Sequence, residues 1–426
     1  MSISTVVDQF ASTYLASQLS RPAGTVATYS ILPGARSLVL SSLFQLSAKA
    51  NRSVVYVTTG TPEADTLASE VSLFLDSNQV VVLPEIDGIP YEWSRRDMVL
   101  SGRRIRAIDR LLQKSPVLLI VPAGALLRQI QNPQTWKDWL VQLKKGQTIE
   151  PIDLIQKLVD VGYHRTERVE GPGEFCLKGS LLDVFPVQSS FPIRIDFFDI
   201  EIDSIRQFNA ETQRSLENLN QATILPATEA LVDEAGLSKL NKKIESYSSK
   251  LRRPDWLLNF NLKNANGRDQ AGLEELLPLV QNYISVIDLF ELAPVVCLDS
   301  DGFALDRAVR VEREYDTLFD REKDSRITVE PDRLINRSVL ELLNPHIGLI
   351  EQKPTSHNKN IDHENLLRVI LHSEHVNLDT GKSNAADTNT IDNNTFENST
   401  IGSFTPMIQA PSSFAGKMTE FRKRAT

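Results

Sequence analysis

The chain's nearest approach to a phosphate-binding loop is the run SILPGARSLVLSSLF at residues 30–44. It follows a strand-like run and opens a helical pattern, which is where an NTPase holds phosphates with backbone N–H groups and a lysine. The pattern G-x-x-x-x-G-K-[ST] is absent, because Gly34 is followed by Arg36 and Ser37 roughly where lysine and Ser/Thr would stand. A plain strand-to-helix turn is the favoured interpretation, and a phosphate contact by Arg36 is the alternative.

An NTPase also needs an acidic pair at the end of an apolar strand. The run VVCLDSDG at residues 295–302 ends its apolar part in Asp299, but Ser300 replaces the second acid. Phosphoryl transfer requires the metal ligand, the lysine and a water-positioning group together. The incomplete phosphate loop and the incomplete acidic pair therefore predict neither catalytic residues nor a bound nucleotide. For residues 295–302, a strand that ends in a turn is the simpler interpretation.

Six arginines are concentrated in RRDMVLSGRRIRAIDR, residues 95–110. Four of them fall near one helical face by three-, four- and seven-residue spacing: Arg96, Arg103, Arg106 and Arg110. Such a face is a candidate contact for a phosphate backbone or an acidic protein. A solvated face that pairs with acids such as Asp97 and Asp109 is the favoured alternative.

The totals describe an ordinary globular chain of two or three domains. It has 426 residues, 41% hydrophobic and 24% charged, and its net charge of -9 argues against non-specific coating of nucleic acid. Neither the distant cysteines, Cys176 and Cys297, nor the histidines His363, His372 and His375 predict a metal site. Without a signal peptide or an apolar run of the ~20 residues that span a bilayer, we expect a cytoplasmic location and no membrane partner.

The run IRIDFFD at residues 193–199 reads as a strand, along which side chains alternate between two faces. Its apolar face would hold Ile193, Ile195 and Phe197. Phe198 would then lie on the opposite face, in line with Arg194 and Asp196. An aromatic beside a cation is the usual composition of an interface hot spot. Cover by a neighbouring loop is the alternative.

The elements that must position these residues fall into two patterns. In residues 1–140, strand-like runs rich in β-branched residues lie at 25–32, 53–59, 80–84 and 117–123. Helical patterns with apolar spacing of three and four lie at 35–50, 62–75 and 99–112. This alternation predicts a parallel sheet covered by helices. Helix-rich α/β character returns at 225–350 and predicts the second part of the same domain.

Residues 141–224 form the second pattern, a short helix followed by closely spaced strands. The helix is expected at 152–163, and the strands at 168–179, 180–186, 193–199, 201–209 and 222–226. Short connections predict an antiparallel meander. The expected fold class is therefore α/β, a parallel-sheet domain with an inserted small α+β antiparallel-sheet domain. Residues 351–402 are expected to be a disordered Asn/Thr-rich linker, and residues 403–426 the start of a further domain.

Residues 162–229 closely resemble the UvrA-binding domain shared by UvrB and the transcription-repair coupling factors. The phrases PGEF, LLDVFP, RIDFFD, EIDSIR and ILPATE match together and in order. Two features favour the coupling factors. The run LPEIDGIPYEWSRRD at 83–97 resembles their short segment, where UvrB carries a long DNA-clamping β-hairpin, and the degraded phosphate loop resembles theirs. The resemblance covers roughly residues 1–350 and implies a UvrB-like domain of degenerate P-loop helicase type.

The resemblance also implies a binding site for UvrA. Arg194 and Phe198 match the family's contact arginine and phenylalanine. Lys178 stands where the family usually has arginine, so it keeps the charge but loses the planar bidentate fork. Glu174 and Phe175 match positions that are expected to be structural.

An adapter function follows from the resemblance: binding UvrA would recruit nucleotide excision repair to a stalled RNA polymerase. RNA polymerase and duplex DNA are implied partners of the family's C-terminal domains, and ATP and magnesium are implied cofactors of its translocase. Because none of these regions is recognisable in the 426 residues, this fragment is expected to have no cofactor and no ATPase of its own. The alternative is a UvrB-like or helicase-type ATP-dependent DNA-binding enzyme.

Overall fold

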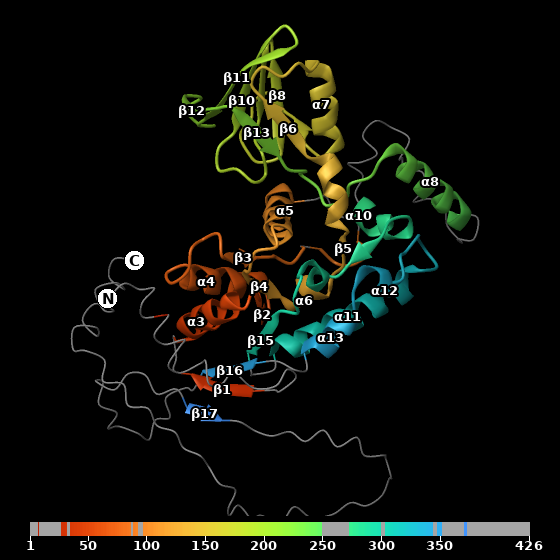
Figure 1. Cartoon of the computed structure of the whole chain (residues 1–426). Coiled ribbons are helices and arrows are strands. Elements are labelled where there is room, and N and C mark those ends of the chain that lie inside the picture. Colours follow the sequence, from red (N-terminus) through yellow and green to blue (C-terminus); the bar gives the residue numbers. More distant parts are fainter. Residues whose placement is uncertain are drawn as a thin grey trace, which may run out of the picture.

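Figure 1 shows the computed structural model of the chain, in which a parallel sheet with helices on both faces carries a smaller antiparallel sheet on one side. The structure describes residues 7, 27–31, 35–86, 88–92, 97–248, 272–299, 303–343, 347–351 and 370–372. Gly34, Arg96 and Ser300 lie outside these ranges, as do nearly all of the expected linker at 351–402 and all of 403–426.

The larger sheet has the strand order β17-β1-β16-β15-β2-β4-β3. Its strands are β1 (Ala27–Ile31), β2 (Val54–Thr58), β3 (Val80–Val82), β4 (Leu118–Pro122), β15 (Val295–Asp299), β16 (Ile347–Glu351) and β17 (Ile370–His372). All pairings are parallel except that of β17 with β1. The expected parallel sheet is confirmed. Central strands β2 and β4 are buried along their whole length, which explains their unbroken apolar sequences.

Helices cover both faces of this sheet. They are α3 (Arg36–Lys49) and α4 (Thr61–Val71) on one face, and α5 (Met98–Leu112), α6 (Ala123–Leu127) and α11 (Phe303–Glu322) on the other. Alternate residues of β2 divide between two apolar clusters, since Tyr56 packs with α3 and α4 while Val55 and Val57 pack with the opposite helices. No helix in the described ranges is long and apolar enough to cross a membrane.

The antiparallel sheet has the order β12-β11-β10-β9-β8-β7, a meander in which only β7 and β8 pair in parallel. Its strands are β7 (His164–Arg165), β8 (Glu174–Lys178), β9 (Leu181–Val184), β10 (Ile193–Phe198), β11 (Glu201–Phe208) and β12 (Ser215–Leu219), and the preceding helix is α7 (Pro151–Asp160). The expected antiparallel sheet is confirmed. Edge strand β12 was not expected.

The expectation that 222–226 belongs to this meander was wrong. Strand β13 (Gln221–Ile224) pairs instead with β6 (Val141–Lys144) in a separate two-stranded sheet. Ile224 lies opposite Val141 in that pair, and both are buried. The two ends of the antiparallel region are thereby held together at its base.

The remaining elements pack around the parallel sheet and its helices. They are β5 (Ile130–Gln131) paired with β14 (Tyr283–Ile284), the helices α8 (Glu234–Ser248), α10 (Leu273–Leu276), α12 (Pro331–Leu334) and α13 (Ser338–Leu343), and the 3₁₀ turns η2 (Pro133–Trp139), η4 (Leu277–Leu279) and η5 (Val286–Leu289). The run at 285–290, which could be strand or helix by its sequence, is the turn η5, and Ser285 and Asp288 form a capping box there.

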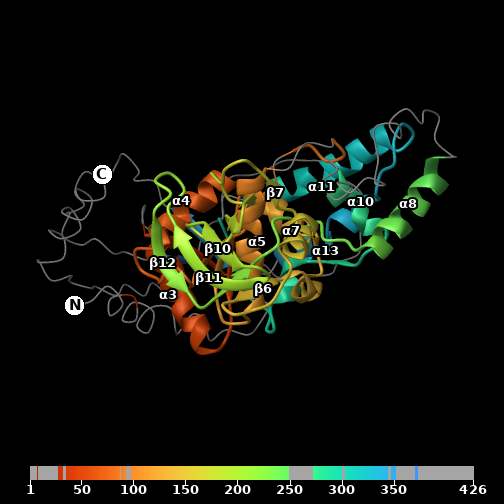
Figure 2. The same cartoon turned by 90° about the horizontal axis from the view of Figure 1, so that it is seen from above.

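Helix α5 lies between the two sheets and joins them (Figure 1; the view from above in Figure 2 places it beneath the antiparallel sheet). Gly102 packs so closely on the segment after β9 that a Cβ there would lie 3.1 Å from the Cβ of Val187. One turn further on, Arg106 donates a hydrogen bond to the Val187 carbonyl at 2.7 Å. One apolar cluster runs through both layers, so the antiparallel sheet has a fixed placement.

Candidate protein interface on the antiparallel sheet

Strand β10 divides its side chains between a buried and an outer face. Ile193, Ile195 and Phe197 are at most 5% exposed, whereas Phe198 is 80% exposed. Arg194 and Asp196, on the same face as Phe198, are half-buried. A large aromatic side chain therefore stands in solvent at the end of a strand whose other aromatic is in the core.

Strand register brings the three residues implied by the resemblance to one face. Lys178 of β8 lies opposite Leu181, and Leu181 lies opposite Asp196 of β10. Because directly paired residues point to the same side of a sheet, Lys178 shares the outer face with Arg194 and Phe198. Lys178 is exposed, and within the described residues no hydrogen bond or ion pair engages its ammonium group.

Arg194 is held by its own sheet. Its Nε and Nη2 donate to the two carboxylate oxygens of Asp183 at 2.6 and 2.7 Å, and Nη2 also donates to the Oε1 of Gln213 at 3.0 Å. The guanidinium lies 4.4 Å from the ring centre of Phe208, a cation–π contact. The hydrogen bonds with Asp183 raise the pKa of Arg194, and only 17% of the side chain is exposed.

The sequence reasoning missed Asp183, Gln213 and Phe208. Asp183 had a usable signal, because it is the lone acid in the strand-like phrase LLDVFP and a meander places it near the arginine of the next strand. Gln213 had none, since its contact depends on how the loop after β11 folds back. Phe208 ends β11 two residues beyond Arg206, which lies opposite Arg194, so its contact follows from a strand register that the sequence alone does not give. Arg168 holds that loop through its Nη2, which donates to the carbonyls of Ala210 and Glu211.

The expected nucleotide loop is described only from residue 35 onward, so Gly34 stays untested. Arg36 opens α3 and forms an ion pair with Glu63 of α4 at 3.5 Å. Ser37 is buried, and its carbonyl accepts a hydrogen bond from the Ser41 hydroxyl. Asp299 ends β15 as expected. These contacts are those of a packed helix start, and phosphate binding here stays a prediction.

The arginine face of α5 is engaged within the chain at each described position. Arg103 pairs with Asp65, and Arg110 donates to the Asn78 carbonyl at 2.6 Å and to the Ser115 hydroxyl at 2.9 Å. Arg106 bonds Val187, as described above. The proposed contact with DNA or a partner stays a prediction. Such a contact would have to replace the intramolecular partner of each of these guanidinium groups.

Arg104 lies off that face by helical spacing, and it is the most deeply buried of the run's arginines that the structure describes. It is 1% exposed, forms two hydrogen bonds to Glu229 at 2.5 and 3.1 Å, and donates to the Pro84 carbonyl at 2.6 Å. Helical spacing separates Arg104 from the arginine face but does not predict its burial, because the acid that neutralises it lies far along the chain.

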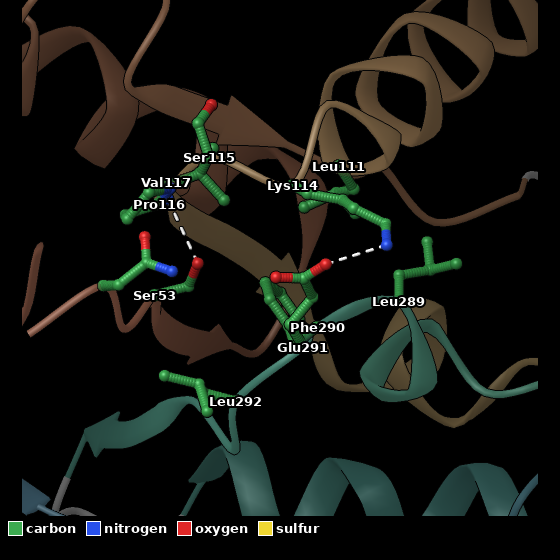
Figure 3. A pocket seen from close by; sticks show the side chains of 11 residues that line it. Ser53, Leu111, Lys114, Ser115, Pro116, Val117, Leu289, Phe290, Glu291 and Leu292 are labelled. Carbon is green, nitrogen blue, oxygen red and sulfur yellow. Dashed lines mark hydrogen bonds and ion pairs between the residues drawn. The ribbon is translucent and has the colours of Figure 1, made fainter.

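Two pockets lie away from the antiparallel sheet. The one in Figure 3, beside the Lys114–Glu291 ion pair, has a volume of about 20 Å³, room for a single water. A second, of about 410 Å³, lies at the carboxyl ends of β2, β3 and β4, and its lining includes Arg128, Glu314 and the ion pair of Arg307 with Glu85 at 3.2 Å. No cluster of three metal-ligating side chains occurs in the described ranges. His363 and His375 lie outside them.

Comparison with known proteins defines the class of the antiparallel region. Residues 141–229 match the UvrB interaction domain, so the exposed Phe198 belongs to a module whose family name denotes an interaction. This range contains the whole six-stranded sheet, together with α7 and the β6–β13 pair.

Up to 78% of the chain aligns with transcription-repair-coupling factors. The protein of Bacillus subtilis (strain 168) is 32% identical over 212 residues, which cover 50% of this chain and 18% of that relative. The protein of Staphylococcus aureus (strain bovine RF122 / ET3-1) is 28% identical over 342 residues, 78% of this chain and 27% of the relative. The chain thus spans about a quarter or less of these relatives. The resemblance to the N-terminal part of a transcription-repair-coupling factor is confirmed.

Proposed function

We propose that this chain is an adapter that binds UvrA through the outer face of its antiparallel sheet, and so recruits nucleotide excision repair to stalled transcription. One observation carries the proposal: Phe198, 80% exposed, lies on the same face as Lys178 in a region that matches the UvrB interaction domain. A phenyl ring left in water contributes little to folding, and burying it against a partner recovers about 2 kcal/mol.

The proposal also covers the parallel-sheet domain, as a UvrB-like scaffold of degenerate P-loop helicase type without nucleotide hydrolysis. Arg36, near the position of the usual lysine, is paired with Glu63, which supports a structural role for this helix start. We assign the remaining partners and cofactors of the family to other regions of the longer family proteins: RNA polymerase, duplex DNA, ATP and magnesium. A magnesium-dependent ATP-binding signal that Arg36→Ala abolishes would favour the alternative, a helicase-type enzyme.

The decisive experiment is a binding titration of purified UvrA against the wild-type chain and single variants. Phe198→Ala should weaken binding by about 2 kcal/mol or more, as expected for a central anchor. Phe191→Ala is the matched control, because Phe191 is a partly exposed aromatic of the same domain, 40% exposed. Thermal unfolding should confirm that both variants fold. Equal UvrA affinity of the wild-type chain and Phe198→Ala would overturn the site assignment. Absence of UvrA binding by the wild-type chain would overturn the proposed function.

A further inference from the structure

The charges around Phe198 sort into those neutralised within the sheet and those left for a partner. Arg194 is paired with Asp183, and the Asp196 carboxylate lies 3.9 Å from the Arg206 guanidinium and accepts a hydrogen bond from Ser180. Both pairs are half-buried on the outer face. Because each charge is matched within the sheet, these two ion pairs stabilise the fold and present little net electrostatic field to a partner.

The hairpin that joins β10 to β11 carries three further carboxylates. Glu201 lies directly opposite Phe198 in the strand register, Asp199 is the residue that follows Phe198, and Asp203 lies two positions after Glu201. All three are exposed, and in the described part of the chain no hydrogen bond or ion pair engages any of these carboxylates. The acids and the aromatic therefore form one projecting unit.

The geometry around the hairpin keeps this unit rigid. Thr148 pairs with Glu201 on the side of β11 away from β10, and the Ile149 amide donates to the Ile200 carbonyl at 2.9 Å. The Gly146 amide donates to the Ile202 carbonyl at 2.8 Å. Glu201 is thus flanked by backbone on both sides, so that its carboxylate is presented from an ordered strand at little further cost in conformational entropy.

From this arrangement we infer that the β10–β11 hairpin is an acidic specificity element, and that its partner surface is an apolar pocket for Phe198 bordered by basic side chains that face Glu201. Lys178 lies two strands away from β10, about 10 Å across the sheet, and marks the side on which the partner presents an acid. The inference rests on the proposed function and deepens it, because it assigns a role to Glu201 that the resemblance did not imply.

The inference is tested by charge reversal in the same UvrA titration. Glu201→Lys should raise the Kd by about tenfold and Glu201→Gln by about threefold, mostly through a slower association rate, because charges at an interface rim steer encounter. Glu217→Lys is the matched control. Glu217 is an exposed acid of the same domain on β12, a strand that pairs with the opposite end of β11, and its reversal should change the Kd by less than about twofold.

Salt supplies a second readout. Binding of the wild-type chain should weaken as ionic strength rises, and Glu201→Lys should flatten this dependence. If Glu201→Lys binds as tightly as the wild-type chain while Phe198→Ala does not bind, the acidic element is overturned and the proposed function stands. If Glu217→Lys weakens binding as much as Glu201→Lys, the effect is one of net charge and the inference is also overturned. If the wild-type chain does not bind, both the proposed function and this inference fail.

Discussion

Arg194 and Asp183 lie directly opposite each other on neighbouring strands, and two hydrogen bonds of 2.6 and 2.7 Å join the guanidinium to the carboxylate. The ring of Phe208 and the amide of Gln213 fix the guanidinium further. The arginine that the resemblance marks as a contact is therefore also a structural member of the sheet. Substituting it changes both the surface that a partner meets and the support beneath that surface.

Asp183→Asn separates these two roles. The variant keeps Arg194 but removes the negative charge that orients it, so we expect UvrA binding to weaken less than with Arg194→Ala. We expect the free energy of unfolding to fall by about 1 kcal/mol, because the pair is partly exposed and an amide oxygen still accepts one bond. Titration and urea unfolding of both variants check this. Full loss of binding by Asp183→Asn at unchanged stability would contradict it.

Arg104→Met tests the buried ion pair at the junction of the two sheets. Removing the guanidinium leaves Glu229 charged and nearly buried, which should lower the free energy of unfolding by about 3 kcal/mol or more. Arg103→Met, one residue away, removes a partly exposed pair with Asp65 and should cost less than about 1 kcal/mol. Urea unfolding measures both, and equal losses would show that burial does not distinguish the two pairs.

Tyr163→Phe tests a second connection at the same junction. The buried Tyr163 hydroxyl donates to the Leu225 carbonyl at 2.9 Å and accepts from the Val187 amide at 3.2 Å. The substitution leaves both backbone groups unsatisfied while the ring is kept, so we expect a loss of about 1 to 3 kcal/mol in thermal or urea unfolding. Tyr247→Phe, in which the altered tyrosine is 38% exposed, is the control and should be neutral. Unchanged stability of Tyr163→Phe would mean that neither bond contributes.

Glu275→Gln should change how stability depends on pH. Burial raises the pKa of Glu275 above its ordinary 4.5, while its carboxylate accepts from the Tyr91 amide. A raised pKa favours the protonated form in the fold, so this contribution to stability is present below pH 4.5 and is lost as the pH rises through the raised pKa. The glutamine variant cannot ionise. Its stability relative to wild type should therefore increase from pH 4.5 upward and then level off.

Urea unfolding at several pH values measures this difference. The control is Glu291→Gln, because the Glu291 side chain is 50% exposed and forms a surface ion pair with Lys114. That variant should show little change in its relative stability over the same range. A flat difference for Glu275→Gln would mean that the neighbouring arginines compensate fully for burial of the carboxylate.

The sequence was sufficient for elements with strong apolar periodicity and for the outward placement of Phe198. Strand β12 escaped notice because all of its residues but Leu219 are exposed, so no alternation marks it and only pairing with β11 makes it a strand. The role of Arg104 also lay beyond sequence pattern, whereas the pairing of Asp183 with Arg194 could have been inferred only once the register of β9 and β10 was known. Each is set by one partner, and strand register or a distant acid chooses that partner.

The contacts of α5 fix the orientation of the antiparallel sheet relative to the parallel sheet. Gly102 packs closely on Val187, and Arg106 donates a hydrogen bond to the Val187 carbonyl. Arg104 pairs with Glu229, at the C-terminal end of the antiparallel region. A joint with attachments on more than one side resists twisting as well as bending. A partner bound at Phe198 would therefore be coupled stiffly to the parallel sheet. A force on the partner would be transmitted through α5 to that sheet.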